Sequence, residues 1–199
     1  MPRLKPYVGE YYHIYNRGVD KRNIFMDEND YVRFLKSIDK FNYLGVQLPE
    51  SGVGLRLVEL ICYCLNPNHF HLLMKQITDK GIEKFMHKLG TSYTNYFNLK
   101  YNRSGSLFEG KYKARHVQDN ASLLWLSAYI NGNPEIHQIA KANNYKWSSY
   151  PYYLDKRKKD ICNQKEVLDQ FEDVSEYQDF VKMVIQEVKF NRREIKGLG

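Results

Sequence analysis

The spacing of hydrophobic and polar residues predicts alternating strands and helices in the first part of the chain. Runs rich in tyrosine, isoleucine and other β-prone residues predict four strands, at residues 10–16, 55–67, 69–76 and 111–117. Apolar residues that recur at spacings of three and four predict two amphipathic helices, at residues 27–44 and 80–99. The elements therefore follow the order strand, helix, strand, strand, helix, strand.

This order is that of the split βαβ motif. We therefore expect an α+β fold, with a ferredoxin-like (split βαβ) antiparallel sheet and helices packed mainly on one face. A further helix is predicted at about 120–132, because Asp119 or Asn120 can cap its N-terminus and Pro134 limits it just after Asn133.

The remainder of the chain predicts a helical extension. An irregular aromatic stretch at 145–154 precedes the basic run DKRKKD (155–160), which has the composition of a solvated linker. Two modest helical patterns follow, at roughly 164–172 and 175–190. We expect a main domain at residues 1–154, with the basic linker and C-terminal helical extension at 155–199.

Charge and aromatic content point to a polyanionic partner. The 199 residues carry a formal net charge of +7, and aromatic residues make up 15% of the chain, including 17 tyrosines. Cations bind phosphates and aromatic rings stack on unpaired bases, so this pairing suits a nucleic acid.

Cysteine usage and hydropathy indicate a reducing compartment and no membrane span. The three cysteines, Cys62, Cys64 and Cys162, are an odd number and form no CxxC pair, which argues against a disulfide framework. No apolar run approaches the length needed to cross a bilayer, and the N-terminus has no apolar signal region. We expect a cytoplasmic protein.

The stretch CLNPNHFHLLMKQ (64–76) has two histidines on either side of one apolar residue. Alternate side chains of a strand share a face, so Phe70 and Leu72 face the core while His69 and His71 face the other side. The α-carbons of two such residues lie roughly 7 Å apart, close enough for both imidazoles to bind one metal ion. The alternative is that both are partly buried histidines, hydrogen-bonded to neighbouring groups.

A zinc knuckle is a second alternative for these histidines. The turn after the preceding strand brings Cys62 and Cys64 close to His69 and His71, and these ligand types suit zinc. The spacing C-x-C-x4-H-x-H is not a common finger pattern, however, and the two pairs need not project on the same face of the sheet.

A further ligand and a nucleophile are predicted on the helix at about 120–132. Four tyrosines are followed four residues later by Asn, Gln, His, Asp or Glu: Tyr12, Tyr43, Tyr112 and Tyr129. Tyr12 and Tyr112 lie in predicted strands and Tyr43 lies where its helix ends before Gly45, so only Tyr129, with Asn133, lies inside a predicted helix. Residues four apart on a helix project side by side, so the two side chains can reach the same ion. The alternative is that LLWLSAYI packs in the core, with Tyr129 as one of its buried aromatic residues.

Five stretches, in order along the chain, resemble the landmarks of the REP-associated tyrosine transposases and, more broadly, of the small single-tyrosine transposases of the HUH superfamily. They are YYHIYNRGVDKRNIF (11–25), NPNHFHLLMK (66–75), YNRSGSLFEGKYKA (101–114), AYINGNP (128–134) and WSSY (147–150). The resemblance covers about residues 7–153. After Pro134 the sequence EIHQIAKANN departs from the small and aliphatic residues usual in the family.

The resemblance implies a role for each of four residues. His69 and His71 are expected to bind a divalent metal ion, Mg²⁺ or Mn²⁺, with Asn133 as the third ligand and Tyr129 as the nucleophile. A free tyrosine titrates near about pH 10 and is a poor nucleophile at neutral pH, so it requires such an ion nearby.

The implied enzyme is a DNA transposase and endonuclease. It would cleave and rejoin single-stranded DNA next to hairpin (palindromic) elements, through a 5′-phosphotyrosine intermediate and a free 3′-hydroxyl. We expect it to act as a monomer or homodimer on single-stranded or hairpin DNA, in the cytoplasm and associated with the nucleoid when bound to DNA.

Five cations are candidates for binding the DNA backbone. Lys111, Lys113 and Arg115 alternate along the last predicted strand, which would place three cations on one face. Arg17 and Arg103 can add to this phosphate track. The alternative for each is simple solvation.

Two other functions stay open at this point. One is a domesticated, catalytically silent protein that still binds hairpin DNA. The other is a metal-dependent phosphoesterase, in which the ion activates water and Tyr129 only packs.

Overall fold

The computed structural model describes residues 6–44, 54–155 and 161–197. Its centre is a four-stranded antiparallel sheet with the strand order β2-β3-β1-β4. The strands are β1 (Tyr11–Arg17), β2 (Val58–Asn66), β3 (His69–Gln76) and β4 (Lys113–His116). This is the strand order of a ferredoxin-like fold, so the predicted fold class is confirmed. Most of the basic run predicted as a linker, residues 156–160, lies outside the described residues.

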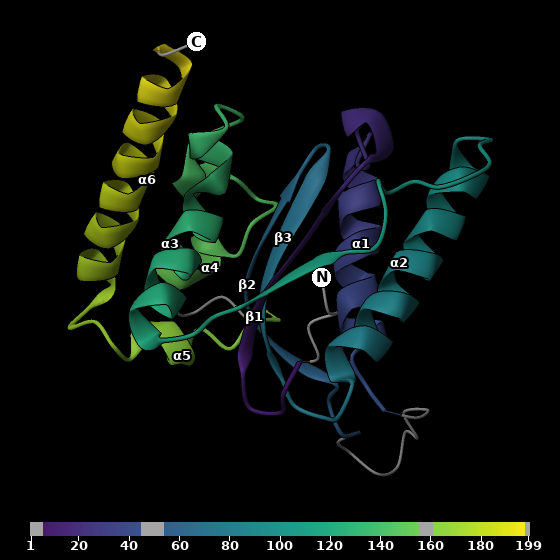
Figure 1. Ribbon diagram of the computed structural model, residues 1–199, viewed down its shortest axis with the longest axis horizontal. Helices are drawn as coiled ribbons and strands as arrows, with labels where there is room; N and C mark the ends of the chain where they lie inside the picture. The colour runs from purple at the N-terminus through teal and green to yellow at the C-terminus, as the bar shows by residue number, and fades with distance from the viewer. Residues whose placement is uncertain (1–5, 45–53, 156–160, 198–199) are drawn as a thin grey trace.

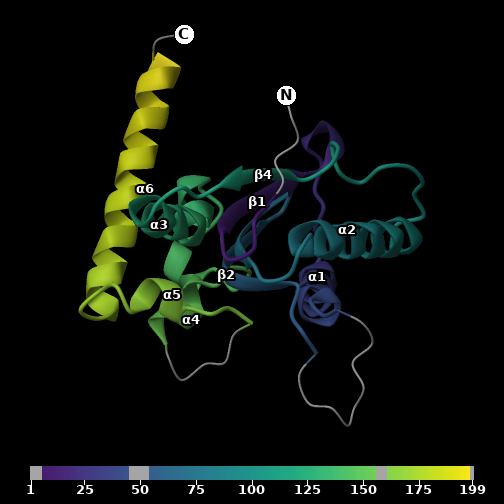
Figure 2. The same cartoon turned by 60° about the horizontal axis from the view of Figure 1, so that its bottom comes forward.

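Helices cover both faces of this sheet (Figures 1 and 2). On one face lie α1 (Glu28–Phe41) and α2 (Gly81–Lys100), as the split βαβ motif requires. On the other lie α3 (Asn120–Ile136), α4 (Tyr150–Leu154), α5 (Lys165–Leu168) and α6 (Val174–Gly197). The short 3-10 helices are η1 (Val19–Lys21) and η2 (Ala142–Asn144). The helices are thus shared between the faces more evenly than we expected.

The sequence pattern explains why the two helices of the motif form where they do. Asp27 caps α1, because its side chain accepts a hydrogen bond from the Asp30 N–H while the Asp30 side chain accepts from the Asp27 N–H. Phe34 and Ile38 of α1 are buried beneath the sheet, as their helical spacing predicted. The predicted boundaries of α1 and α2 agree with the structure to within three residues.

Strand β3 separates two hydrophobic cores by the alternation of its side chains. Phe70, Leu72 and Met74 pack toward α1 and α2, as expected, and belong to the larger core. Leu73 belongs to a second core, together with α3 and α6. The histidine face of the sheet is therefore covered by helices as well.

Helix α3 continues through Pro134 to Ile136, so the predicted end near residue 132 was wrong. A proline inside a helix removes one backbone hydrogen bond and crowds the preceding turn. Here it lies in the last turn, and the His137 N–H still donates to the Asn133 carbonyl at 3.0 Å. The extra turn places His137 at the C-terminal end of α3.

A buried polar network attaches α3 to the edge of the sheet. The Ser149 hydroxyl accepts a hydrogen bond from the Tyr63 N–H of β2 at 2.9 Å and donates to Asn131 Oδ1 of α3 at 2.8 Å. The Asn131 amide then donates to the Tyr177 hydroxyl of α6 at 2.9 Å. All four residues are buried, so the network fixes α3 and α6 relative to β2.

Close packing of α6 on α3 depends on a glycine. A Cβ atom added at Gly132 would lie 2.6 Å from the Ile185 side chain of α6. Gly132 therefore lets the two helices approach at this point. Within the described ranges, no helix has both the length and the apolar composition of a membrane span.

Removing one hydroxyl from the buried network should measurably destabilise the fold. The substitution Ser149→Ala removes the hydroxyl that bonds to the Tyr63 N–H and to Asn131 Oδ1 in a buried site, and a loss of this kind typically costs about 1–3 kcal/mol. Urea unfolding followed by circular dichroism measures this loss. The control Ser104→Ala removes an exposed hydroxyl and should change the free energy of unfolding by less than about 0.5 kcal/mol. Equal stability of the two variants would contradict the importance of the network.

Candidate functional site

His69 and His71 lie on the sheet face that α3 covers. The neighbours of His71 across the sheet are Tyr15 of β1 and Cys64 of β2, whose side chains share its face. His69 opens β3 and pairs with Asn66 at the end of β2. The alternation predicted from the sequence is confirmed, and it aims both imidazoles at α3.

His71 is held by a second histidine. His13 of β1 lies on the same face, and its Nε2 is 2.8 Å from His71 Nδ1. Burial lowers the pKa of His13 to about 4, with the Arg115 charge adding to the effect, and burial also holds the pKa of His71 well below its usual value. Both imidazoles are neutral at pH 7, which is the state that binds metal ions.

His69 is oriented by two asparagines. Its Nδ1 lies 2.6 Å from Asn68 Oδ1, so Nδ1 carries the proton and Nε2 presents a lone pair. That Nε2 lies 2.9 Å from the amide nitrogen of Asn66. Burial, followed by the charges nearby, lowers the pKa of His69 to about 4.

Asn133 of α3 meets the same amide group. Asn66 Nδ2 donates a hydrogen bond to Asn133 Oδ1 at 2.5 Å, so one NH₂ group faces the lone pairs of both His69 and Asn133. Asn133 is fully buried, and its own Nδ2 has no hydrogen-bond partner among the residues that the structure describes. The lone pairs of His69 Nε2 and Asn133 Oδ1 therefore point at the Asn66 amide, which carries a partial positive charge. Together with His71, these two atoms form a ligand set that fits a divalent cation.

Tyr129 lies one turn before Asn133 on the same face of α3. Its ring centroid is 5.9 Å from that of His71, and the two rings are nearly perpendicular. Its other face stacks on Trp125 at 5.5 Å. The Tyr129 side chain is half-buried and lines a cleft, so the alternative of a fully core-packed tyrosine does not describe it.

The cleft has a volume of about 400 Å³ and brings together side chains from strands, helices and a loop. The histidines and Tyr129 line it, and four cationic residues surround them: Arg17, Lys21, Lys113 and Arg192. A phosphate in this cleft would meet the tyrosine, the histidines and these cations at once.

The predicted DNA-binding cations do not all lie at this cleft. Lys113 lines it, but the guanidinium of Arg17 is paired with Glu109, with one contact at 2.7 Å. Arg115 lies on the same face, over the Tyr15 ring. Lys111 precedes β4 and lines a different hollow, so the expectation of three cations on one strand face was wrong.

Arg103 lies elsewhere again. Its guanidinium donates to Asn98 Oδ1 at 3.0 Å and lies over the Phe97 ring, both in α2. These contacts hold it on the face of the sheet opposite the cleft. A direct role at the cleft is therefore not favoured by its position.

The zinc knuckle is not supported. Cys62 and Cys64 do share the histidine face, but both are buried, and Cys64 Sγ contacts Asn66 Oδ1 at 3.4 Å. In the part of the chain that the structure describes, no three His, Cys, Asp or Glu side chains gather as a metal-binding group. A set of two histidines and one amide oxygen falls outside that description.

Sequence reasoning missed four residues of the site: His13, Asn66, His137 and Arg192. His137 follows Asn133 by four residues, so the spacing that singled out Tyr129 and Asn133 could have been extended by one more turn. Its ring lies 5.1 Å from that of His69, and Arg192 Nη2 of α6 lies 3.3 Å from its Nε2. No local pattern indicates Arg192, because only the packing of α6 brings it there.

Comparisons with known proteins agree with the motifs. Residues 54–133 match the family model described as "Transposase IS200 like". No curated protein sequence matches the chain. The fold is similar to that of a REP-associated tyrosine transposase solved bound to a REP hairpin, with 11% identity and a TM-score of 0.57, covering 81% of this chain and 88% of that one.

A second solved structure, of a putative transposase from Deinococcus radiodurans R1, is 16% identical and covers 71% of this chain and 99% of that one, at a TM-score of 0.41. The resemblance to the single-tyrosine transposases is confirmed by the family match within residues 54–133. The first of the two structures shows that the fold is shared as well.

The low pKa values of the site predict neutral histidines in mildly acidic solution. Histidines of an unfolded chain titrate near about pH 6.5, so at about pH 5.5 the folded protein binds fewer protons than the unfolded one, and stability should fall as the pH drops toward 4. Ring ¹⁵N shifts measured in EDTA should show His13 and His69 neutral at about pH 5.5. Shifts of a charged imidazole at either residue would contradict the burial seen here.

Proposed function

We propose that this protein is a metal-dependent DNA transposase and endonuclease of the HUH single-tyrosine type. It cleaves and rejoins single-stranded DNA next to hairpin elements through a 5′-phosphotyrosine intermediate. One observation carries the proposal: His69, His71 and Asn133 converge beneath α3, and Tyr129 lies one turn away in the same cleft. The family match within residues 54–133 supports it.

The substrate class is supported from two sides. The structurally similar REP-associated transposase is bound to a REP hairpin, and we infer hairpin-flanking DNA for this chain as well. The net charge of +7 suits a DNA substrate independently of that likeness. Lys113 and Arg115 project on the face of the cleft, where they would hold the backbone of the strand to be cut.

The residues at the convergence point would hold the metal ion. His69 Nε2 and Asn133 Oδ1 would be two of the ligand atoms, which their shared contact with the Asn66 amide supports, and His71 would be the third ligand. A divalent ion such as Mg²⁺ or Mn²⁺ supplies Lewis-acid stabilisation of charge on a non-bridging phosphate oxygen. When His69 and Asn133 bind an ion, the Asn66 amide can no longer donate hydrogen bonds to His69 Nε2 and Asn133 Oδ1.

Tyr129 performs the chemical step. Its Oη forms a bond to phosphorus, the bond from phosphorus to the 3′ oxygen breaks, and the leaving oxygen takes up a proton while the tyrosine loses one. The products are a 5′-phosphotyrosine and a free 3′-hydroxyl. Trp125 stacks on the Tyr129 ring and limits its motion, which keeps the hydroxyl directed at the cleft.

Rejoining is the reverse of this step with a different strand. A 3′-hydroxyl attacks the phosphotyrosine, so one phosphodiester forms for each one broken and no energy-rich cofactor is needed. The surrounding residues act by position: His13 and Asn68 fix the imidazoles of His71 and His69. The cleft cations counter the charge of the scissile phosphate and its neighbours.

The substitution Tyr129→Phe should abolish covalent capture of DNA. It removes the nucleophilic oxygen and keeps the ring, so binding of metal and hairpin DNA should persist while the protein–DNA adduct and the 3′-hydroxyl product both disappear. Denaturing gels with a labelled single strand flanking a hairpin measure the adduct. The matched control is Tyr15→Phe, because Tyr15 lines the same cleft and its ring centroid is also 5.9 Å from that of His71.

The outcomes of this gel separate the three candidate functions. An adduct in Tyr15→Phe and none in Tyr129→Phe supports the transposase. Cleavage without any adduct would indicate a phosphoesterase, and intact DNA in the unmodified protein would indicate a silent hairpin-binding protein. An adduct in Tyr129→Phe, located by mass spectrometry on another tyrosine, would refute the catalytic assignment alone.

The substitutions His69→Ala and His71→Gln should each weaken Mn²⁺ binding by at least about tenfold and abolish cleavage, because each removes one of three protein ligands. Calorimetric titration with Mn²⁺ measures the affinity without DNA. His87→Ala, on the exposed side of α2, is the control and should keep the Mn²⁺ affinity. Wild-type Mn²⁺ affinity in either site variant would refute the ligand assignment.

A further inference from the structure

A second hollow lies on the opposite face of the sheet from the cleft. It has a volume of about 730 Å³ and lies between α2 and the segment at residues 106–112 that leads into β4. We call it the α2 groove. It is lined by side chains that include Lys80, Lys84, Thr94, Ser106, Lys111 and Tyr112.

The chemistry of the α2 groove suits a nucleic-acid strand. Three lysines and His87 line it, against one acidic residue, Glu83. Within the described residues, neither Lys80 nor Lys111 forms an ion pair, and the Lys84 side chain donates a hydrogen bond to the Asp79 carbonyl. Aromatic and amide side chains complete the lining, which is the combination that binds phosphates and unpaired bases.

A glycine in the middle of α2 opens this groove. Glycine inside a helix is less stable than alanine, because it loses more conformational freedom on folding. Gly90 has no packing reason for its small size, since a Cβ atom added there would meet nothing within 4 Å. Gly90 lines the α2 groove, so the missing side chain leaves room for a ligand against the helix.

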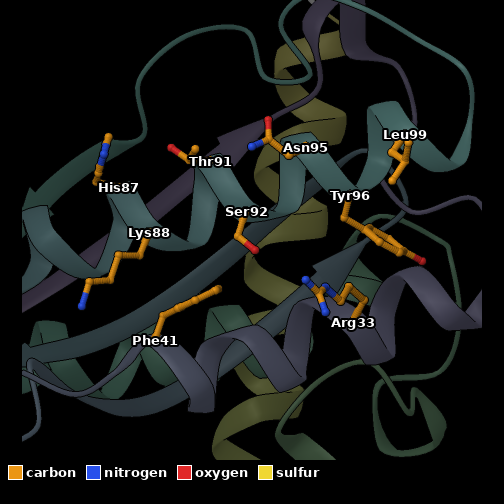
Figure 3. A pocket seen from close by; sticks show the side chains of 9 residues that line it. All are labelled: Arg33, Phe41, His87, Lys88, Thr91, Ser92, Asn95, Tyr96 and Leu99. Atoms are coloured by element: carbon orange, nitrogen blue, oxygen red, sulfur yellow. The ribbon is translucent and has the colours of Figure 1, made fainter. Parts of the chain in front are cut away.

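The α2 groove has a well-defined outer wall. Figure 3 shows His87, Thr91 and Asn95 along one edge of α2, while Lys88 and Ser92 point to the other side of the helix, toward α1. The three residues of the edge line both the α2 groove and a shallower hollow between α1 and α2. They form a polar ridge that bounds the groove on its outer side.

The α2 groove reaches the end of the sheet where the catalytic cleft begins. Asn16 and Phe70 line both hollows, and they pair with each other at the ends of the inner strands β1 and β3. Near these strand ends Gly110 also has open space beyond its α-carbon, and its carbonyl accepts a hydrogen bond from Asn16. Lys113 lines the cleft and Lys111 lines the groove, so cations lie at both hollows.

We propose that the α2 groove binds the single-stranded DNA that continues from the strand cut in the catalytic cleft. The groove's volume of about 730 Å³ lies in the range of small-molecule sites, roughly 300–1,000 Å³, which is room for unpaired nucleotides. A base would stack on Tyr112, the half-buried aromatic residue of the lining, while the lysines hold the phosphates. The choice of DNA rests on the proposed function, whereas the groove itself is a feature of the fold.

Anisotropy of labelled oligothymidylates, measured in EDTA to prevent cleavage, tests the groove by strand length. An oligonucleotide of about four nucleotides fills the cleft alone, and one of about twelve also reaches the groove. The unmodified protein should bind the longer one more tightly. Gly90→Phe fills the groove and should bind the longer strand about tenfold less tightly, with no change for the shorter one.

The matched control is Gly90→Ala, whose methyl group leaves the groove open and should keep both affinities. Should Gly90→Phe misfold, the double variant Lys80→Gln and Lys84→Gln provides a second test. It should reduce the salt dependence of the affinity for the longer strand and leave that for the shorter strand unchanged. Equal affinity for the two lengths, or full affinity of Gly90→Phe with its native circular dichroism, would overturn the proposal. If the affinity for blunt duplex DNA rose with length as much as the affinity for the single strand, the proposal would be overturned as well.

Because the experiment measures binding without chemistry, its failure is distinct from failure of the proposed function. Adduct formation through Tyr129 with the shorter strand tests the cleft, and it should be unchanged in Gly90→Phe. A protein that forms the adduct but shows no length dependence lacks the groove contact. A protein that shows length dependence without an adduct binds DNA in the groove but is not the proposed enzyme.

Discussion

The buried hydrogen-bond network between β2, α3 and α6 is the constraint on which the candidate site depends. Asn131 lies between Tyr129 and Asn133 in sequence, and its side chain is bonded to Ser149 and, through its amide, to Tyr177. Because every member is buried, shifting α3 along the sheet would leave several polar groups without partners. The same contacts that stabilise α3 therefore hold the tyrosine and the amide opposite the histidines.

Neutral imidazoles in a basic protein are the second physical feature of the site. Burial and nearby cations both disfavour the charged form of the histidines, so their pKa values lie below the usual range. The lone pairs are then available, and Asn66 presents an amide N–H₂ to two of the proposed ligand atoms. This arrangement orders the ligands before an ion binds, which lowers the conformational cost of binding.

The two faces of the sheet carry different parts of the proposed function. The cleft under α3 holds the groups suited to chemistry, and the α2 groove on the other face holds lysines and a helix glycine. Glu109 pairs with Arg17 at the mouth of the cleft and removes one cation from the track, so charge alone does not locate the DNA. The chain links both hollows where it enters β4, because Lys111 lines the α2 groove and Lys113, the first residue of β4, lines the cleft.

Local periodicity in the sequence determined the strands and helices, the face shared by His69 and His71, and the side-by-side placement of Tyr129 and Asn133. Each follows from the repeat of a strand or a helix, which involves only neighbours along the chain. Tertiary structure alone decided that α3 covers the histidine face, that it continues through Pro134, and that His13 and Arg192 join the site. These contacts depend on strand register and helix packing between residues far apart in sequence, and no local spacing encodes them.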